Sequence, residues 1–196
     1  MRIALFVFIL SCSVAQAGTF THAPTNLHFP DRLAKWKKVK VTQFPQKHLG
    51  VEIDYSGPGD AIASFYIYTG GVGSIPTGAQ NAAVKREFVK TQDEMASAMQ
   101  SRFRNVQKFM ESTPDVTNKG RKATLLAAAY QFHDPTPGGH RRLSWVLLTG
   151  FKHHFLKLRY THLYDKDTDT GQEALRDLVM SFLAANEDNA ASFWMR

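Results

Sequence analysis

Two apolar runs joined by a short turn constrain the fold of this chain more than any other feature. The stretch at 143–164 reads LSWVLLTGFKHHFLKLRYTHLY, and its turn is Lys152-His153-His154. Residues 145–151 are apolar on both faces, as expected of a central strand. The second run alternates with period two: one face carries Leu156, Leu158 and Tyr160, and the other carries Phe155, Lys157 and Arg159. We therefore predict a β-hairpin in the middle of a sheet.

Two further alternating runs predict a second hairpin. Residues 51–55 read VEIDY and residues 61–69 read AIASFYIYT, with the turn signal SGPGD between them. Five residues between such runs favour an antiparallel pair. On the second strand, one face carries Ile62, Tyr66 and Tyr68 and the other carries Phe65 and Ile67. We predict another strand over 124–132, preceded by a loop at 114–122.

The period changes from two to about 3.6 in the middle of the chain. Apolar residues recur there at spacings of three, four or seven: Val84, Phe88, Met95, Met99, Phe103, Val106 and Met110. This stripe predicts a long amphipathic helix from Asn81 to Met110, with Asn81 as its N-cap. We expect Phe103 to be buried between this helix and the sheet.

A second helix is predicted near the C-terminus. Its apolar face consists of Leu175, Leu178, Val179 and Phe182. Thr170 and Glu173 have the spacing of a capping box, which places the helix start at Thr170. We expect the tail at 186–196, with its bulky Phe193, Trp194 and Met195, to pack back on the domain or to present a small apolar patch.

These elements predict an α+β fold. We expect a central, mostly antiparallel sheet of about six strands, covered by the long helix on one face and the C-terminal helix on the other. The element order, with LGVEIDYSGPGDAIASFYIYTGG at 49–71 and TGFKHHFLKLRYTH at 149–162, resembles uncharacterised secreted bacterial proteins of the PsbP-like fold. The resemblance covers about residues 27–185. It implies an αβα sandwich and a binding or assembly role, without a catalytic signature.

Residues 1–17 are typical of a signal peptide. Arg2 supplies the positive charge, residues 3–10 form a short apolar run, and Ala15-Gln16-Ala17 is a small-residue cleavage site. Cleavage after Ala17 would leave one domain at 18–196, with its core at about 27–185 and no transmembrane span. We expect a periplasmic or secreted protein. The alternative is a lipoprotein anchored through Cys12, which is the single cysteine of the chain.

The charge of the chain suggests an anionic partner. The formal net charge is +7, or +6 once Arg2 is removed with the leader. The basic residues are scattered, without the aromatic interleaving of a nucleic-acid platform, so we expect no nucleic acid. We expect the partner to be an anionic envelope component or a protein. The sequence leaves the oligomeric state open. We predict no cofactor and assign no catalytic residue.

Three loop histidines, His133, His140 and His154, are the candidate metal ligands. Imidazoles from adjacent loops suit Zn²⁺, Cu²⁺ or Ni²⁺, although no HExxH or comparable spacing is present. The stretch 165–171, DKDTDTG, resembles a calcium loop, but its glycine stands at position 7 rather than 6 and position 12 is Arg176. A polar loop before a helix explains these acidic residues.

Two functional hypotheses follow. The first is an exported, non-catalytic binding or accessory protein of the bacterial envelope; the alternative is a metal-binding protein or metal-dependent enzyme that uses the loop histidines. Candidate binding residues are Lys157, Arg159, Tyr66 and Tyr68. Two cations beneath a helix would be costly to desolvate. Either their strand lies near the sheet edge, which we favour, or Lys157 and Arg159 line an open groove for an acidic ligand or partner.

Overall fold

The structure is a computed structural model that describes residues 13–14, 18–118, 121–136, 138–164 and 168–188. Most of the expected signal peptide lies outside these residues, as do residues 165–167 of the predicted polar loop and the apolar tail residues Phe193, Trp194 and Met195. Among the residues that the structure describes, no helix combines the length and hydropathy that a membrane span requires.

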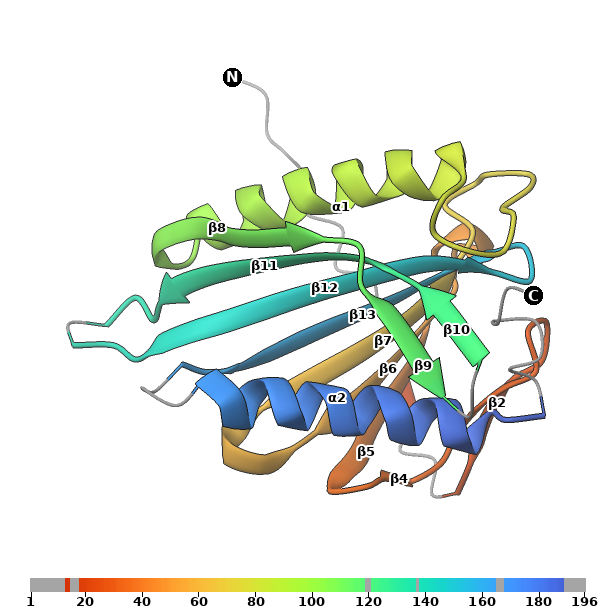
Figure 1. Cartoon of the computed structure of the whole chain (residues 1–196), viewed down its shortest axis with the longest axis horizontal. Helices are drawn as coiled ribbons and strands as arrows, with labels where there is room; N and C mark the ends of the chain where they lie inside the picture. Colours follow the sequence, from red (N-terminus) through yellow and green to blue (C-terminus); the bar gives the residue numbers. More distant parts are fainter. Residues whose placement is uncertain (1–12, 15–17, 119–120, 137, 165–167, 189–196) are drawn as a thin grey trace.

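One antiparallel sheet dominates the fold (Figure 1). Its strands are, in spatial order, β1 (Ser13–Val14), β5 (Trp36–Gln43), β6 (Val51–Ser56), β7 (Ile62–Tyr68), β13 (His154–Leu163), β12 (Arg141–Phe151), β11 (Leu126–His133) and β8 (Arg104–Ser112). The short β4 (Arg32–Leu33) also pairs with β5. Two hairpins form separate small sheets: β2 (Phe20–His22) with β3 (Leu27–Phe29), and β9 (Asp115–Asn118) with β10 (Arg121–Thr124). The described sheet is therefore larger than the six strands expected.

The central hairpin forms as predicted. β12 and β13 pair from Arg142 with Leu163 to Phe151 with His154, which leaves Lys152 and His153 as a two-residue loop. Both loop residues have positive φ angles, 44° and 64°. Two consecutive residues in the left-handed region give the loop a twist that fits the right-handed twist of the flanking strands. A two-residue loop can therefore join β12 to β13.

Helix α1 (Ala82–Gln100) begins where expected and ends earlier. The Asn81 side chain accepts a hydrogen bond from the Val84 N–H at 2.9 Å, as an N-cap does. The predicted extension to Met110 is wrong, because residues 104–112 form β8 along the outer edge of β11. Backbone pairing at that open edge outweighs a side-chain stripe that fits a helix equally well.

Phe103 therefore lies at the junction of α1 and β8, not within a helix. Its ring packs on that of Phe132, with centroids 4.4 Å apart, and the side chain is half-buried. Phe103 thus keeps its contact with the sheet, but it stays partly open to solvent where α1 has ended.

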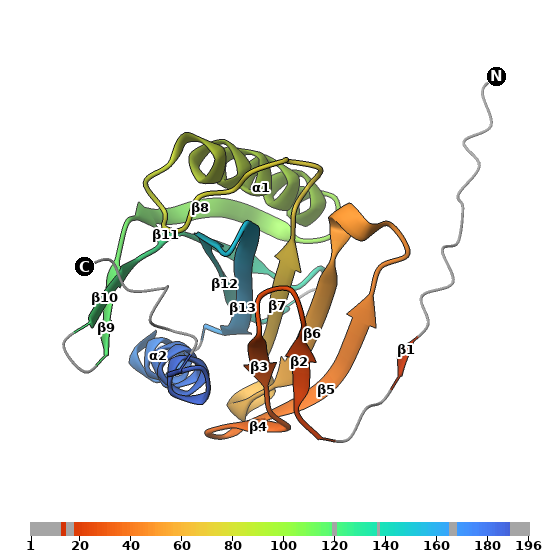
Figure 2. The same cartoon turned by 90° about the vertical axis from the view of Figure 1, so that its right-hand side faces the viewer.

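Helix α2 (Thr168–Ala185) covers the opposite face of the sheet from α1 (Figure 2). It begins two residues before Thr170, so the predicted capping box is wrong. Its predicted apolar face is confirmed: Leu178 and Phe182 are buried, and Leu175 and Val179 are partly buried. Phe182 packs against Phe65 and Phe29, with ring centroids 4.8 and 5.3 Å apart.

The side chain of Asn186 forms hydrogen bonds that join the N-terminal hairpin to the end of α2. Asn186 is 1% exposed; its Oδ1 accepts from the His28 N–H at 2.7 Å, and its Nδ2 donates to the His28 carbonyl at 2.9 Å. The same amide group donates to the Phe182 carbonyl. The two bonds to His28 join residues 158 positions apart in the chain.

The hairpin also contacts the central turn. The His22 ring lies edge-on to that of His154, with centroids 5.3 Å apart, and Lys152 Nζ donates to the Thr25 carbonyl at 3.0 Å. Burial, and then the charge of His154, lower the pKa of His22 to about 4. Burial also lowers the pKa of His162.

We predict that Phe182→Ala lowers the free energy of unfolding by about 3–5 kcal/mol, because a buried aromatic ring is removed from a closely packed cluster. Urea unfolding followed by circular dichroism measures the change. Val89→Ala is the control, since Val89 is 57% exposed and should change the value by less than about 0.5 kcal/mol. Equal effects for the two variants would mean that α2 does not pack on the sheet.

We predict that stability decreases as the pH falls from 6.5 towards 4. The unfolded chain takes up a proton on His22 near pH 6.5, whereas the folded chain takes it up only near pH 4, so acid favours unfolding across this range. His22→Gln should reduce the slope of unfolding free energy against pH. This variant should keep a smaller slope, because burial also lowers the pKa of His162 in the folded chain. His48→Gln, at an exposed position, is the control; an identical slope in the His22 variant would contradict the buried contact.

Candidate functional site

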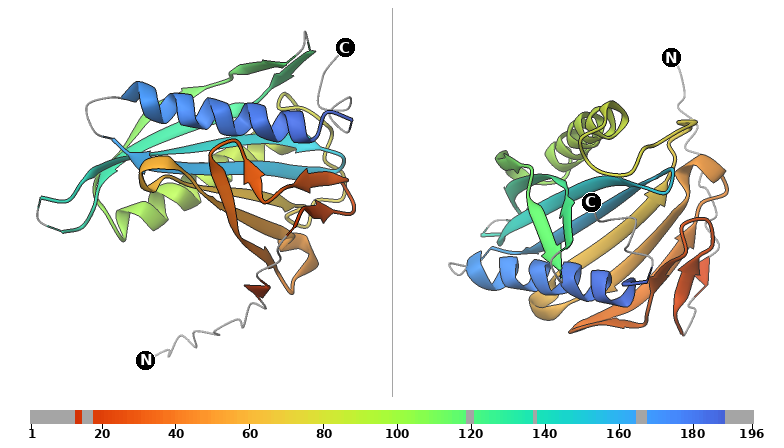
Figure 3. Two further views of the ribbon diagram at one scale, coloured as in Figure 1. Left: turned by 90° about the horizontal axis from the view of Figure 1, so that it is seen from below. Right: turned by 45° about the vertical axis from the view of Figure 1, so that its right-hand side comes forward.

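The incomplete cover of one sheet face creates the candidate site. Helix α1 packs over β8, β11 and β12, and the neighbouring strands β13, β7 and β6 extend beyond it. Figure 3 shows the two helices on opposite faces of the sheet, with strands reaching past α1. Part of the α1 face of β7 and β13 is therefore left without a helix above it.

The predicted position of the cations at a sheet edge is wrong. β13 pairs with β7 on one side and with β12 on the other, so it lies in the centre of the sheet. Lys157 lies opposite Tyr66, and Arg159 lies opposite Ser64. Alternation along β13 gives Leu156, Leu158 and Tyr160 to the α2 face, as predicted, which sends both cations to the α1 face.

The structure brings the four predicted binding residues together. Lys157 Nζ lies 4.7 Å from the ring centroid of Tyr66 and 4.9 Å from that of Tyr68, within cation–π distance of both. Tyr68 donates a hydrogen bond to Glu87 of α1 at 2.7 Å. Burial lowers the pKa of Lys157, an effect that the charge of Glu87 opposes. Lys157 and Tyr68 thus belong to the packed layer below α1.

Arg159 and Tyr66 line an open groove beside that layer. The groove has a volume of about 460 Å³ and is lined by Ile62, Ser64, Tyr66, Met99, Phe103, Phe132, Asp134, Arg142, Arg159 and Thr161. We call it the arginine groove. Its size is that of a small-molecule site.

The arginine groove contains two guanidinium groups in different electrostatic states. Arg142 Nε donates to Asp134 Oδ1 at 2.8 Å, so its charge is balanced. Arg159 is half-buried, and its Nε is buried without a hydrogen-bond partner among the described residues. A buried guanidinium N–H without a partner is costly, and an anion would satisfy it.

The remaining lining divides into hydroxyls and an apolar wall. Ser64 donates to Asp54 at 2.5 Å, and Thr161 shares a hydrogen bond with Ser144 at 2.8 Å, so both hydroxyls have partners. The wall consists of Met99 from α1, Phe103 from the α1–β8 junction and Phe132 from β11. An anionic group at Arg159 would therefore have apolar surface beside it.

Arg142, Asp134 and the apolar wall were not predicted from the sequence. Counting back along β12 from Leu148 and Val146 in steps of two residues places Arg142 on the α1 face. The sequence pattern could therefore have identified Arg142. Phe132 lies opposite Arg142 on β11, which only the strand register shows. The wall also depends on where α1 ends.

The three predicted metal ligands are not brought together. His133 and His140 flank one end of β12, where Asp134 N donates to the His140 carbonyl, and His154 lies beyond the other end. An eleven-residue strand spans about 35 Å, so one ion cannot bind all three, and the predicted shared site is wrong. Within the described ranges, no group of three or more His, Cys, Asp or Glu is placed to hold a metal ion.

Comparisons with known proteins assign no family to the chain. No protein-family profile matches the chain, and no curated protein matches it by sequence. Among solved structures, the solution structure of cyanobacterial PsbP (CyanoP) from Synechocystis sp. PCC 6803 is similar to this chain, with a TM-score of 0.46 and 13% sequence identity. The match covers 86% of this chain and 91% of that chain. The α+β arrangement expected from the strand and turn patterns is seen in the structure itself, as an antiparallel sheet with two helices.

Proposed function

We propose that this chain is a non-catalytic binding protein whose arginine groove takes a small organic anion. The ligand would carry a carboxylate or phosphate group on an apolar or aromatic body. The observation that carries the proposal is Arg159, a half-buried guanidinium without a described hydrogen-bond partner beside an apolar wall.

The charge balance of the groove favours an anion with a single charge. Asp134 neutralises Arg142, which leaves Arg159 as the lining cation without an acidic partner in the described contacts. The nearby Asp54 carboxylate accepts a hydrogen bond from Ser64, and no ion pair between Asp54 and Arg159 is among the described contacts. A planar guanidinium binds carboxylate or phosphate oxygens in pairs, and partial burial strengthens that bond.

The other groups of the groove suit binding rather than reaction. A guanidinium keeps its proton at neutral pH, and the hydroxyls of Ser64 and Thr161 are held by neighbouring side chains. The ring of Phe103 is half-buried and packs on the buried ring of Phe132, so Phe103 offers the accessible apolar surface for the body of the ligand.

We propose further that the protein acts outside the cytoplasm of a bacterium. The support is the tripartite pattern of residues 1–17, which ends in Ala15-Gln16-Ala17. N-terminal sequencing of protein from an envelope fraction should begin at Gly18. A blocked, lipid-modified Cys12 would instead identify a lipoprotein, and an intact Met1 would contradict export.

We predict that phenylacetate binds with a measurable Kd and that Arg159→Gln weakens it by tenfold or more. A hydrogen bond to a charged group contributes about 1.5–3 kcal/mol, which corresponds to about 10- to 150-fold in Kd. Isothermal titration calorimetry with phenylacetate and phenyl phosphate measures the effect, and the neutral phenylacetamide tests the charge requirement.

Arg86→Gln is the matched control, because Arg86 is an exposed arginine of α1 outside the groove lining. The Arg159 variant must also keep the wild-type circular dichroism spectrum. Equal binding by the two arginine variants, or equal affinity for phenylacetate and phenylacetamide, would exclude Arg159 as the anion site.

A further inference from the structure

The residue expected to become the N-terminus of the mature chain lies beside a carboxylate. Gly18 stands two residues before β2, and the pairing of β2 with β3 sets Phe20 opposite Phe29. The same antiparallel alignment, continued by two residues, sets Gly18 opposite Asp31. Phe20 and Phe29 are both buried, with ring centroids 6.3 Å apart. The N-terminal hairpin, rather than the leader, therefore positions Gly18.

The two oxygens of the Asp31 carboxylate have different partners. Oδ2 accepts a hydrogen bond from the Gly18 N–H at 2.7 Å, and Oδ1 is paired with Lys38 Nζ at 3.0 Å. Lys38 Nζ also donates to the carbonyls of Gly18 and Phe29. The Asp31 carbonyl accepts from the Lys38 N–H at 2.8 Å, so the backbone as well as the side chain fixes this acid.

The carboxylate is ionised and accessible. The hydrogen bond from Gly18, and then that from Lys38, lower the pKa of Asp31 below its usual value, and the charge of Lys37 adds to the effect. The Asp31 side chain is 52% exposed. Tyr55 also interacts with this carboxylate, but burial and then the charge of Asp31 raise the pKa of its hydroxyl, which stays neutral. A positive charge at Gly18 would therefore meet a negative one.

Cleavage after Ala17 changes the chemistry of this contact. Hydrolysis of the peptide bond leaves a carboxylate on Ala17 and an amine on Gly18, and the amine takes up a proton. An α-amino group has an ordinary pKa of about 7.7–8.0, so it is mostly an ammonium at pH 7. The neutral N–H donor near Asp31 thus becomes a charged donor at the same place. Opposite charges then add their attraction to the hydrogen bond.

We propose that Asp31 is the binding site for the α-ammonium group that cleavage creates on Gly18, an inference that rests on the export proposed above. The ammonium and Lys38 share the carboxylate through different oxygens. A lipoprotein anchored through Cys12 keeps a peptide bond at this place, and a cut one residue earlier moves the charge by about 3.8 Å. The contact therefore distinguishes the mature chain from its precursor and closes the open end of the N-terminal hairpin.

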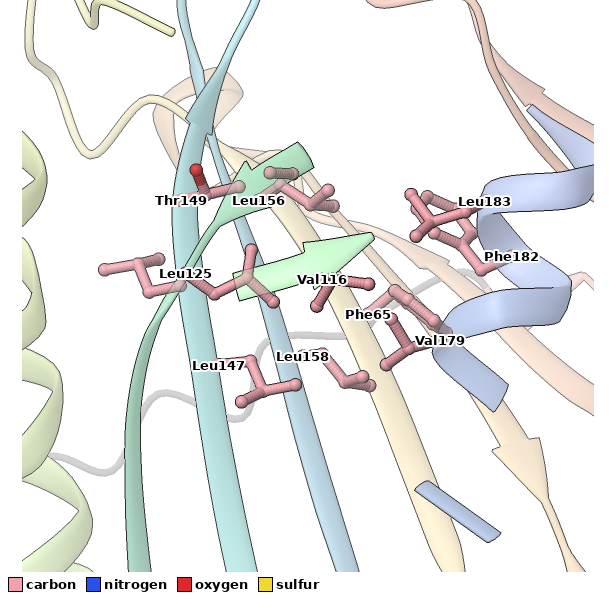
Figure 4. Close-up of a pocket in the computed structure, with 12 residues that line it drawn as sticks. Phe65, Val116, Leu125, Leu147, Thr149, Leu156, Leu158, Val179, Phe182 and Leu183 are labelled. Atoms are coloured by element: carbon pink, nitrogen blue, oxygen red, sulfur yellow. The ribbon is translucent and has the colours of Figure 1, made fainter. Parts of the chain in front are cut away.

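A chain that begins at Gly18 contains what it needs to fold. The described buried residues of both apolar cores lie between Phe20 and Leu183. Figure 4 shows part of one core, where side chains of the sheet and of α2 point towards one another. Cleavage would remove β1, which pairs Ser13 and Val14 with the outer strand β5. The sample for the test is therefore the mature chain, obtained from a fusion that is cut directly before Gly18.

The test is a titration of the terminal amino group, followed by NMR through the Cα signal of ¹³C-labelled Gly18. We expect a pKa above about 8, because a nearby negative charge favours the ammonium. Asp31→Asn should lower this pKa by about 0.5 or more. Asp93→Asn, at an exposed position of α1, is the charge-matched control and should leave it unchanged. A pKa that does not respond to Asp31→Asn would overturn the proposal.

A second chain tests the position of the charge. It begins at Ala17, so its ammonium lies one residue further along, and Asp31→Asn should change its pKa by less than half as much. An equal response of the two chains would indicate a general effect of charge and overturn the proposal. If Asp31→Asn loses the wild-type circular dichroism spectrum, the two unsubstituted chains decide: the chain from Gly18 should have the higher pKa, and equal values would overturn the proposal.

This inference and the proposed export fail in different ways. Protein from an envelope fraction that starts at Met1, or at a lipid-modified Cys12, would overturn cleavage after Ala17 and this inference with it. A start at Gly18 together with an unresponsive pKa would overturn the ammonium site alone.

Discussion

Pairing between β12 and β13 is the interaction on which the rest of the structure depends. The two strands form ten residue pairs, and the neighbours on either side, β7 and β11, extend the same antiparallel pattern. Because strand side chains alternate, this register determines which residues face α1 and which face α2. A shift by one residue would place Lys157 and Arg159 under α2 and expose Leu156 and Leu158, so the two cores and the arginine groove depend on one alignment.

Much of the sheet could be predicted because its strands have a clear period of two. The central hairpin, the pairing of 51–56 with 62–68 and the apolar face of α2 all follow from local alternation and turn residues. Residues 103–112 could not be assigned in this way, because Phe103, Val106 and Met110 fit a helical stripe. The open edge of β11 decides their structure, and that edge is a tertiary property.

The candidate site, too, could be predicted from the sequence only in part. Alternation brings Tyr66, Lys157 and Arg159 to one face, and adjacent strands place them side by side. Whether that face lies at an edge or in the centre depends on strand order, which no local pattern contains. The apolar wall requires the end of α1 at Gln100 and the return of the chain as β8. The partner of Arg142 likewise depends on the conformation of the loop that carries Asp134.

The bonds between Asn186 and His28 have a consequence for how the chain folds. They close a loop that contains almost the whole domain, and ordering so long a loop is slow because its entropic cost precedes its contacts. The N-terminal hairpin therefore obtains its last partners only after residue 186 has left the ribosome. The contact between the N-terminal hairpin and the end of α2 is therefore among the last of the fold to form.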